Sequence, residues 1–192
     1  MRIVCLISGG GSNLQSIIDA ERRGELGLAH LIGVISNNPD APGLIRATSA
    51  CIPTHVLSHL SYSCREAFEF DLTRIIDECH PDLLVLAGFM QILTKTFVDH
   101  YQGRIINIHP SLLPKYKGLD THQRAINAGD KLAGASIHWV TTELDAGEVI
   151  RQVTVPIFSN DTAETLKLRV LQAEHRLYPE VIRDLAKDFI TS

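Results

Sequence analysis

The sequence predicts an α/β protein with a Rossmann-like three-layer fold. In this fold a mostly parallel central sheet of about seven strands carries helices on both faces. Three observations predict it. Short apolar runs alternate with segments of helical periodicity. A glycine-rich segment joins the first apolar run to the first helical segment. Two β-like runs near the C-terminal end flank a short turn-rich segment, so we expect a hairpin that makes the sheet partly antiparallel.

In the first half of the chain, strands and helices are expected to alternate. The first strand, Arg2–Ser8, is almost continuously apolar, and Ser12–Arg23 follows with apolar residues at helical spacing. Asp82–Ala87 is apolar on both faces, which is typical of a central strand in a parallel sheet. Between them we expect, in order, a strand at Ala29–Asn37, a short helix at Pro42–Ala50, a short strand at Ile52–Leu57 and a helix at Tyr62–Cys79.

The second half continues the alternation and then changes to the expected hairpin. We expect, in order, a short helix near Thr94–Tyr101, a strand at Arg104–His109, a loop at Pro110–Asp120, a helix at Thr121–Ala128 and strands at Ala135–Val140 and Glu148–Pro156. The run Asp161-Thr-Ala-Glu164 resembles a capping box and predicts the start of a helix. Leu166, Val170, Ala173 and Leu177 share one face of that helix, and Pro179 is expected to end or kink it.

Length and composition set the broad class. A chain of 192 residues predicts one domain, here all of residues 1–192. The net charge of −4 argues against binding to nucleic acid or to an anionic membrane, since both need a basic surface. No apolar run is long enough to span a bilayer, and the N-terminus lacks the pattern of a signal peptide. The four cysteines are far apart, so we expect reduced thiols and a cytoplasmic location.

The glycine-rich segment Ser8-Gly9-Gly10-Gly11-Ser12-Asn13 is a candidate anion site. Glycines allow close approach of backbone N–H groups, and a helix N-terminus favours negative charge. A dinucleotide fingerprint would need glycine at Leu14 and an acidic residue near Asn37, and a P-loop would need Gly-Lys-Ser/Thr. The segment therefore predicts a site for one phosphate. The alternative is a tight strand-to-helix turn that binds nothing.

Asn107 and His109 form a second candidate site. Residues i and i+2 of a strand face the same way, so both side chains project together, and Pro110 keeps the His109 backbone extended. The carboxyl end of a strand is where open α/β sheets bind ligands. An amide next to an imidazole suits an oxyanion that develops on a carbonyl carbon. The alternative is a histidine that only makes hydrogen bonds at a strand end.

The remaining polar residues are less informative. Asp145 is a candidate partner of His109, but Asp and Gly are also ordinary turn residues, and spacing does not show whether Asp145 reaches His109. His55 and His59 have no accompanying zinc motif, so no metal site is predicted. His138 is interpreted as packing or a pocket wall.

Taken together, these motifs resemble the folate-dependent formyltransferases. The Asn107-Ile108-His109-Pro110-Ser111-Leu112-Leu113-Pro114 run is specific to that family, and the Gly-Ser-Asn loop narrows the resemblance to the phosphoribosylglycinamide formyltransferases. The other matching stretches are Ile7–Gln15, Leu86–Met90, Thr142–Gly147 and Glu174-His175, so the resemblance covers nearly the whole chain.

The resemblance implies transfer of a formyl group from 10-formyltetrahydrofolate to the amine of glycinamide ribonucleotide, a step of de novo purine biosynthesis. Asn107 and a protonated His109 would stabilise the oxyanion, with His109 as proton donor. Asp145 would orient His109 and raise its pKa. The folate is a co-substrate, and neither a metal nor a redox cofactor is implied.

The resemblance also implies where each substrate binds. The N-terminal half would hold the ribonucleotide, and the C-terminal half would hold the folate and the catalytic residues. The implied contacts to glycinamide ribonucleotide are Gly11, Ser12, Asn13, Leu14, Gln15 and Glu174. The implied contacts to folate are Arg65, Met90, Gln91, Ile92, Leu93, Asn107, Thr141, Thr142, Glu143, Leu144 and Asp145. The implied assembly is a monomer or a homodimer.

Four positions depart from the family pattern. Gly10 stands where a side chain such as Asn is frequent, and Gln91 replaces a common basic residue. Lys117 stands where Pro is frequent, and Asp120 where His is frequent. We expect these departures to affect substrate binding and loop closure but not the reaction type.

Three other functions compete with this one. A formyltetrahydrofolate deformylase shares the core motifs but uses water as acceptor, and it usually carries an extra N-terminal domain. A methionyl-tRNA formyltransferase carries a C-terminal tRNA-binding domain, for which we expect no room in this chain. A non-catalytic module that binds a phosphorylated metabolite would need the glycine-rich loop but not Asn107, His109 and Asp145.

Overall fold

The computed structural model describes residues 1–191, which form a seven-stranded sheet with the order β3-β2-β1-β4-β5-β6-β7. The first five strands are parallel, and β6 and β7 are antiparallel. The strands are β1 (Arg2–Ile7), β2 (His30–Ser36), β3 (Thr54–Val56), β4 (Leu83–Leu86), β5 (Ile105–His109), β6 (Leu132–Trp139) and β7 (Val149–Pro156). The predicted fold class is confirmed.

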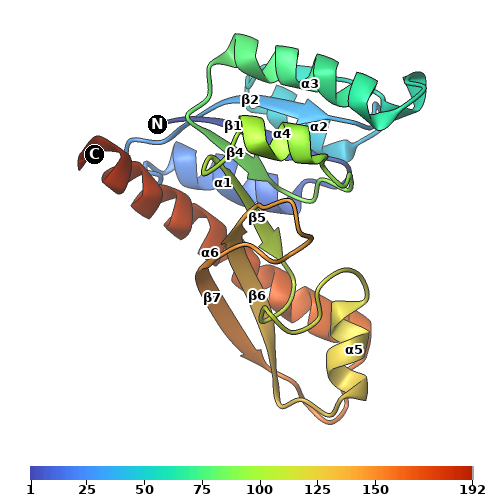
Figure 1. The fold of residues 1–192 in the computed structure, drawn as a ribbon. Helices are drawn as coiled ribbons and strands as arrows, with labels where there is room; N and C mark the ends of the chain where they lie inside the picture. The colour runs from blue at the N-terminus through green and yellow to red at the C-terminus, as the bar shows by residue number, and fades with distance from the viewer. Residues whose placement is uncertain (192) are drawn as a thin grey trace.

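Helices cover both faces of the sheet (Figure 1). They are α1 (Ser12–Arg22), α2 (Pro42–Ser49), α3 (Arg65–Cys79), α4 (Lys95–His100), α5 (Thr121–Asn127) and α6 (Ala163–Thr191), with a short 3-10 helix at His59–Ser61 that the sequence did not predict. Alternate residues of β1 serve the two sides, because strand side chains alternate. Ile3, Cys5 and Ile7 pack with α1 and α6, whereas Val4 and Leu6 pack with α3 and α4.

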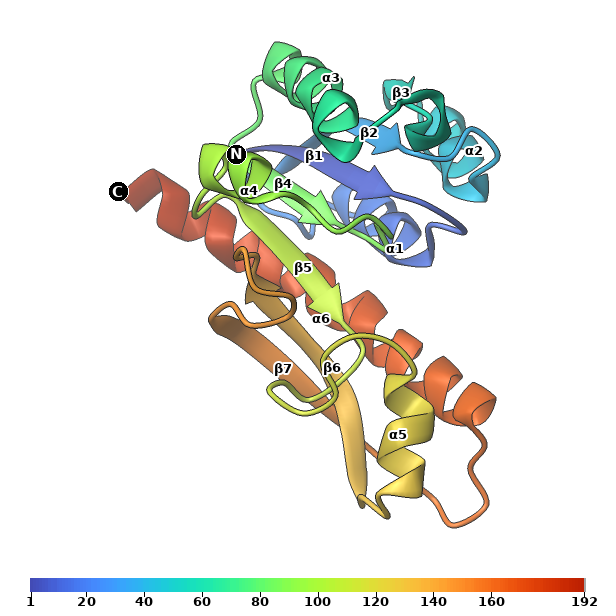
Figure 2. The ribbon, with the colours of Figure 1, turned by 45° about the vertical axis from the view of Figure 1, so that its right-hand side comes forward.

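Helix α6 runs along the sheet and contacts both α1 and the β6–β7 hairpin (Figure 2). It continues through Pro179 to Thr191, so of the two predicted outcomes, an end or a kink at Pro179, the end is wrong. A proline in a helix interior costs about 3 kcal/mol. After Pro179, however, Val181 and Ile182 are at most 1% exposed. Burying such side chains contributes about 1.5–3 kcal/mol each, which favours continuing the helix.

The capping box at the start of α6 is offset from its predicted position. Thr162 and Thr165, not Asp161 and Glu164, make the reciprocal pair. The Thr165 N–H donates to Thr162 Oγ1 at 3.3 Å, and the Thr162 N–H donates to Thr165 Oγ1 at 3.0 Å. Asp161 instead pairs with Arg169 at 2.7 Å. The sequence pattern was ambiguous because Asp161 and Thr162 are adjacent and either residue type can cap a helix.

Candidate active site

The predicted ligand-binding segments meet at one edge of the sheet. Because β1, β4 and β5 are parallel neighbours, their carboxyl ends lie side by side. The glycine-rich loop follows β1, the segment Gly88–Leu93 follows β4, and His109 ends β5. This is the edge at which open α/β sheets bind ligands.

Asn107, His109 and Asp145 come together as the resemblance implied. His109 is 6% exposed, and its Nδ1 lies 3.3 Å from Asp145 Oδ2. Asn107 pairs with His138 across the β5–β6 ladder, and its Nδ2 lies 3.3 Å from His138 Nε2. His138 Nε2 is in turn 3.7 Å from Asp145 Oδ1. The four side chains therefore form one polar cluster, in which His109, His138 and Asp145 are buried and Asn107 is half-buried.

Asp145 reaches His109 because the β6–β7 hairpin loop folds back tightly. A Cβ atom on Gly147 would lie 1.7 Å from the carbonyl oxygen of Trp139, so only glycine fits there. Asp145 itself has a φ of 48°, in the left-handed region that Asp tolerates better than most residues. Its Oδ2 also accepts a hydrogen bond from the Gly118 N–H at 2.9 Å. The Asp145 carboxylate is thus held by the imidazole of His109 and by the backbone of Gly118.

Both ring nitrogens of His109 face oxygen atoms. Nδ1 faces Asp145, and Nε2 lies 2.9 Å from the carbonyl oxygen of Tyr116. Each ring nitrogen can therefore donate a hydrogen bond to the oxygen atom that it faces when it carries hydrogen. Tyr116 belongs to the loop after β5, and its neighbour Lys117 pairs with Glu143 of the hairpin loop at 3.1 Å.

Sequence reasoning underestimated His138. It is 2% exposed, and its Nδ1 lies 2.9 Å from the Trp139 carbonyl oxygen. Burial lowers the His138 pKa, so the ring is neutral with its hydrogen on Nδ1, and Nε2 accepts from the Asn107 amide. The signal was the alternation of β6, which places His138 on one face. Only the pairing of β6 with β5 shows that this face carries His138 opposite Asn107.

The glycine-rich loop leaves the N-terminus of α1 open. Gly11 precedes the helix with a φ of 68°, no side chain caps the helix, and its first turn contains no acidic residue. A Cβ on Gly11 would lie 2.7 Å from the Cα atom of Gly43 in α2, so the loop packs directly on that helix. The N–H groups of the first turn are therefore available to an anion.

Asn13 and Glu174 meet beside this loop, although they are far apart in the sequence. The Asn13 Nδ2 group donates to Glu174 Oε2 at 2.7 Å. Burial raises the Glu174 pKa, while the bond from Asn13 and the charge of Lys167 act in the opposite direction. Asn13 is 8% exposed, and its buried Oδ1 has no hydrogen-bond partner among residues 1–191. A buried acceptor without a donor is unusual and suits a ligand that supplies one.

The other implied ribonucleotide contacts are placed differently. The Leu14 side chain is fully buried in the core, so only its backbone can meet a ligand. Gln15 is occupied on both sides: its Nε2 donates to Asp19 Oδ1 at 2.8 Å, and its Oε1 accepts from Arg46 at 3.2 Å. Ser12 opens α1 and is half-buried.

The implied folate contacts lie on exposed segments. Met90, Ile92 and Leu144 are large apolar side chains that are 53–70% exposed. Gln91 and Leu93 are half-buried, and Thr141, Thr142 and Glu143 are exposed on the hairpin loop. Arg65 is exposed at the start of α3. Exposed apolar residues on two loops next to His109 are suited to an aromatic ligand.

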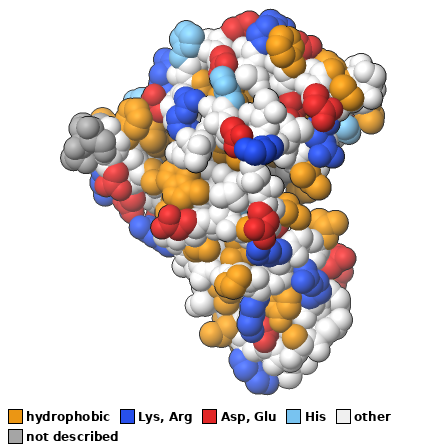
Figure 3. All heavy atoms as spheres, in the orientation of Figure 1, with side chains coloured by type: hydrophobic (Ala, Val, Ile, Leu, Met, Phe, Trp, Pro, Cys, Tyr) orange, Lys and Arg blue, Asp and Glu red, His pale blue; other side chains and the backbone are white. Residues whose placement is uncertain are grey.

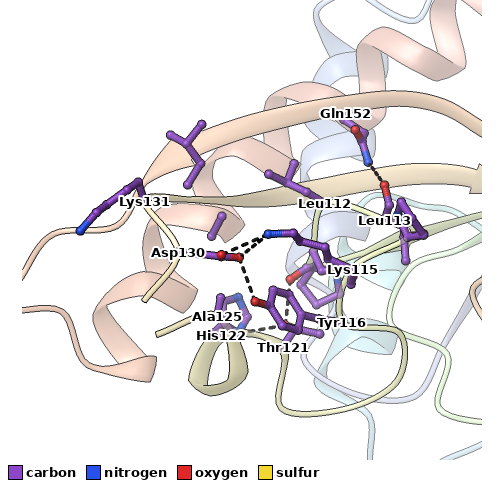
Figure 4. A pocket seen from close by; sticks show the side chains of 15 residues that line it. Leu112, Leu113, Lys115, Tyr116, Thr121, His122, Ala125, Asp130, Lys131 and Gln152 are labelled. Carbon is purple, nitrogen blue, oxygen red and sulfur yellow. Dashed lines mark hydrogen bonds and ion pairs between the residues drawn. The ribbon is translucent and has the colours of Figure 1, made fainter. Parts of the chain in front are cut away.

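A separate cavity of about 490 Å³ lies behind the Tyr116 loop (Figure 4). Leu112, His122 of α5 and Gln152 of β7 are among its walls. Asp130 accepts hydrogen bonds there from Lys115 and from the Tyr116 hydroxyl. None of the site residues implied by the sequence lines this cavity.

The space-filling view shows charges of both signs interspersed on the visible face (Figure 3). Among residues 1–191, no group of three or more His, Cys, Asp or Glu side chains is arranged to hold a metal ion. No helix within that range has both the length and the apolar character needed to cross a membrane. The four cysteines are free thiols.

The chain belongs to the formyl transferase family, whose model matches residues 1–182. Phosphoribosylglycinamide formyltransferase of Escherichia coli is 51% identical over 182 residues, which cover 95% of this chain and 85% of that protein. The trifunctional purine biosynthetic protein adenosine-3 of Bos taurus is 43% identical and matches 96% of this chain with 18% of its own length. The structure of phosphoribosylglycinamide formyltransferase from Coxiella burnetii superimposes with a TM-score of 0.94 at 52% identity, covering 98% of this chain and 88% of that one. The resemblance stated from the sequence is confirmed, and the chain is a transferase.

Proposed function

We propose that this chain transfers the formyl group of 10-formyltetrahydrofolate to the amine of glycinamide ribonucleotide. The products are formylglycinamide ribonucleotide and tetrahydrofolate, within de novo purine biosynthesis. The observation that carries the proposal is the convergence of Asn107, His109 and Asp145 at the sheet edge that also carries the glycine-rich loop. The names of the relatives support the choice of substrates.

The proposed reaction is a direct transfer of the formyl group from one substrate to the other. The substrate amine attacks the formyl carbon, a new C–N bond forms, and the carbonyl oxygen becomes an oxyanion. Asn107 Nδ2 and His109 Nε2 donate hydrogen bonds to that oxyanion. The bond from the carbon to folate N10 then breaks, N10 gains a proton, and the former amine loses one. In this reaction a substrate oxygen takes the place of the Tyr116 carbonyl oxygen, which now accepts from His109 Nε2.

Substrate binding is proposed to divide between the two halves of one domain. The phosphate would bind to Gly11, Ser12 and Asn13 at the start of α1, and the ribose or glycinamide end would bind to Asn13 and Glu174. The folate would lie on Met90, Ile92 and Leu144, with its pterin edge read by backbone groups of residues 90–93 and 141–145 and its acidic tail near Arg65. The enzyme would act in the cytoplasm as a monomer or homodimer.

A spectrophotometric assay with a 10-formyl folate donor, run with and without glycinamide ribonucleotide, tests the proposal. We expect folate deformylation that requires the ribonucleotide and yields one formylated product per turnover. Deformylation at the same rate without acceptor would instead establish a hydrolase. If the folded protein binds both ligands but shows no turnover, the remaining interpretation is a non-catalytic binding module.

A further inference from the structure

Arg46 of α2 lies against the glycine-rich loop from outside the segment. Its Nε donates to the Gly10 carbonyl oxygen at 2.8 Å, and its Nη1 donates to Gln15 Oε1 at 3.2 Å. These two contacts span the loop and the first turn of α1. The guanidinium group is therefore fixed beside the open N-terminus of that helix.

The charge of Arg46 is not neutralised by the protein. Among residues 1–191, no carboxylate lies within ion-pair distance of Arg46, and its Nη2 donates no hydrogen bond. Arg151 and Arg169, by contrast, each have an aspartate partner. The charge of Arg46 also acts on His175 of α6, where it adds to burial in lowering the pKa.

Two positive features are adjacent here. The first is the N-terminus of α1, which has neither a side-chain cap nor an acidic residue. The second is the guanidinium of Arg46 with its free Nη2. Nearby, the buried Asn13 Oδ1 lacks a donor, which independently indicates a ligand at this end of α1. A doubly charged phosphate would satisfy both positive features, and guanidinium groups bind phosphate through parallel hydrogen bonds.

We infer that Arg46 binds the phosphate of the acceptor substrate and makes the enzyme select the phosphorylated acceptor over the unphosphorylated one. The inference rests on the proposed function and adds to it a residue outside the glycine-rich loop. Backbone N–H groups of α1 position the phosphate, and Arg46 supplies the full positive charge that the loop itself lacks.

The test compares Arg46→Gln and Arg46→Lys with wild type. Arg22→Gln is the matched control, because Arg22 is also exposed, also donates to a backbone carbonyl and lies in the last turn of α1. The value of kcat/KM is measured with glycinamide ribonucleotide and with the corresponding dephosphorylated nucleoside, over a range of salt concentrations. Binding of inorganic phosphate is measured by calorimetry as a readout that does not need turnover.

We expect Arg46→Gln to lower kcat/KM for the ribonucleotide roughly 10- to 100-fold, the range for hydrogen bonds to charged groups. The nucleoside and folate values should stay unchanged, the salt dependence of the ribonucleotide KM should flatten, and phosphate should bind more weakly. Arg46→Lys should lie in between, and Arg22→Gln should behave as wild type.

Two results would overturn the inference. One is an active Arg46→Gln variant with the wild-type preference for the phosphorylated acceptor and unchanged phosphate binding. The other is an equal loss for nucleotide and nucleoside with an unchanged salt dependence, which would mean that Arg46 only shapes the loop. A wild-type protein that binds phosphate through Arg46 but does not formylate the ribonucleotide would contradict the proposed function alone.

Discussion

The backbone N–H of Met90 donates a hydrogen bond to the Ser8 hydroxyl at 2.7 Å, although the two residues lie 82 positions apart. The same hydroxyl donates to Asn37 Oδ1 at 2.6 Å, and the Ser8 N–H donates to the Gly88 carbonyl oxygen at 3.1 Å. Ser8 is the first residue of the glycine-rich segment, and Met90 begins the candidate folate segment. The two candidate substrate-binding segments are therefore joined at one side chain.

Replacing Ser8 by alanine should weaken folate binding. The Met90 N–H would lose its acceptor, and a hydrogen bond of this kind contributes about 1 kcal/mol, which corresponds to roughly a 5-fold rise in the folate KM. Ser8→Thr keeps the hydroxyl and should restore binding. Thr48→Ala is the control, since that exposed hydroxyl bonds only within its own helix. A folate KM that Ser8→Ala leaves unchanged would show that the bond does not position the segment.

Asn107→Ala and His109→Ala should each lower kcat by a factor on the order of 10²–10³, the usual cost of losing one oxyanion donor. Steady-state kinetics with both substrates saturating measures this effect, and thermal unfolding checks that the variants are folded. A variant with near-normal kcat would remove that residue from the proposed mechanism.

Asp145→Asn should reduce kcat while preserving the fold. The amide is nearly isosteric and can still accept from the Gly118 N–H, but it places no negative charge opposite His109 Nδ1. The loss expected for impaired acid–base catalysis is on the order of 10²–10⁴. The pH–rate profile should change together with kcat. A profile identical to that of wild type would contradict the coupling between Asp145 and His109.

Glu174 should make stability depend on pH. Burial raises its pKa, so the folded chain keeps the proton at pH values where the unfolded chain has released it. This contribution to stability is complete below the unfolded pKa of about 4.3, and it is lost as the pH rises through the raised folded value. Glu174→Gln cannot ionise. Urea unfolding should therefore show this variant gaining stability relative to wild type as the pH rises above the unfolded pKa, and a difference that does not change with pH would be inconsistent with the shift.

Glu174→Ala tests the binding role of the same residue. It removes the acceptor that holds Asn13 and should raise the KM for glycinamide ribonucleotide more than the KM for folate. The opposite order of effects would assign Glu174 to the folate side of the site.

Local patterns were sufficient for most of the fold. The apolar runs of β1 and β4 and the helical periodicity of α1 and α3 predicted the elements, because strand and helix side chains repeat with different periods. Pro179 shows the limit of such rules. The local preference of proline was outweighed by burial of Val181 and Ile182, which depends on residues elsewhere in the chain.

The sequence by itself determined the chemistry of the candidate site. Asn107 and His109 share a face because they are two apart on a strand. The glycine-rich segment lies between the first strand and the first helix, so it places backbone N–H groups at a helix N-terminus. Tertiary structure decided which distant groups meet these residues. Asp145 and His138 reach the cluster only because β6 pairs antiparallel with β5 and the Gly147 loop folds back. Strand order and loop closure depend on packing between distant segments, and spacing along the chain carries no direct record of them.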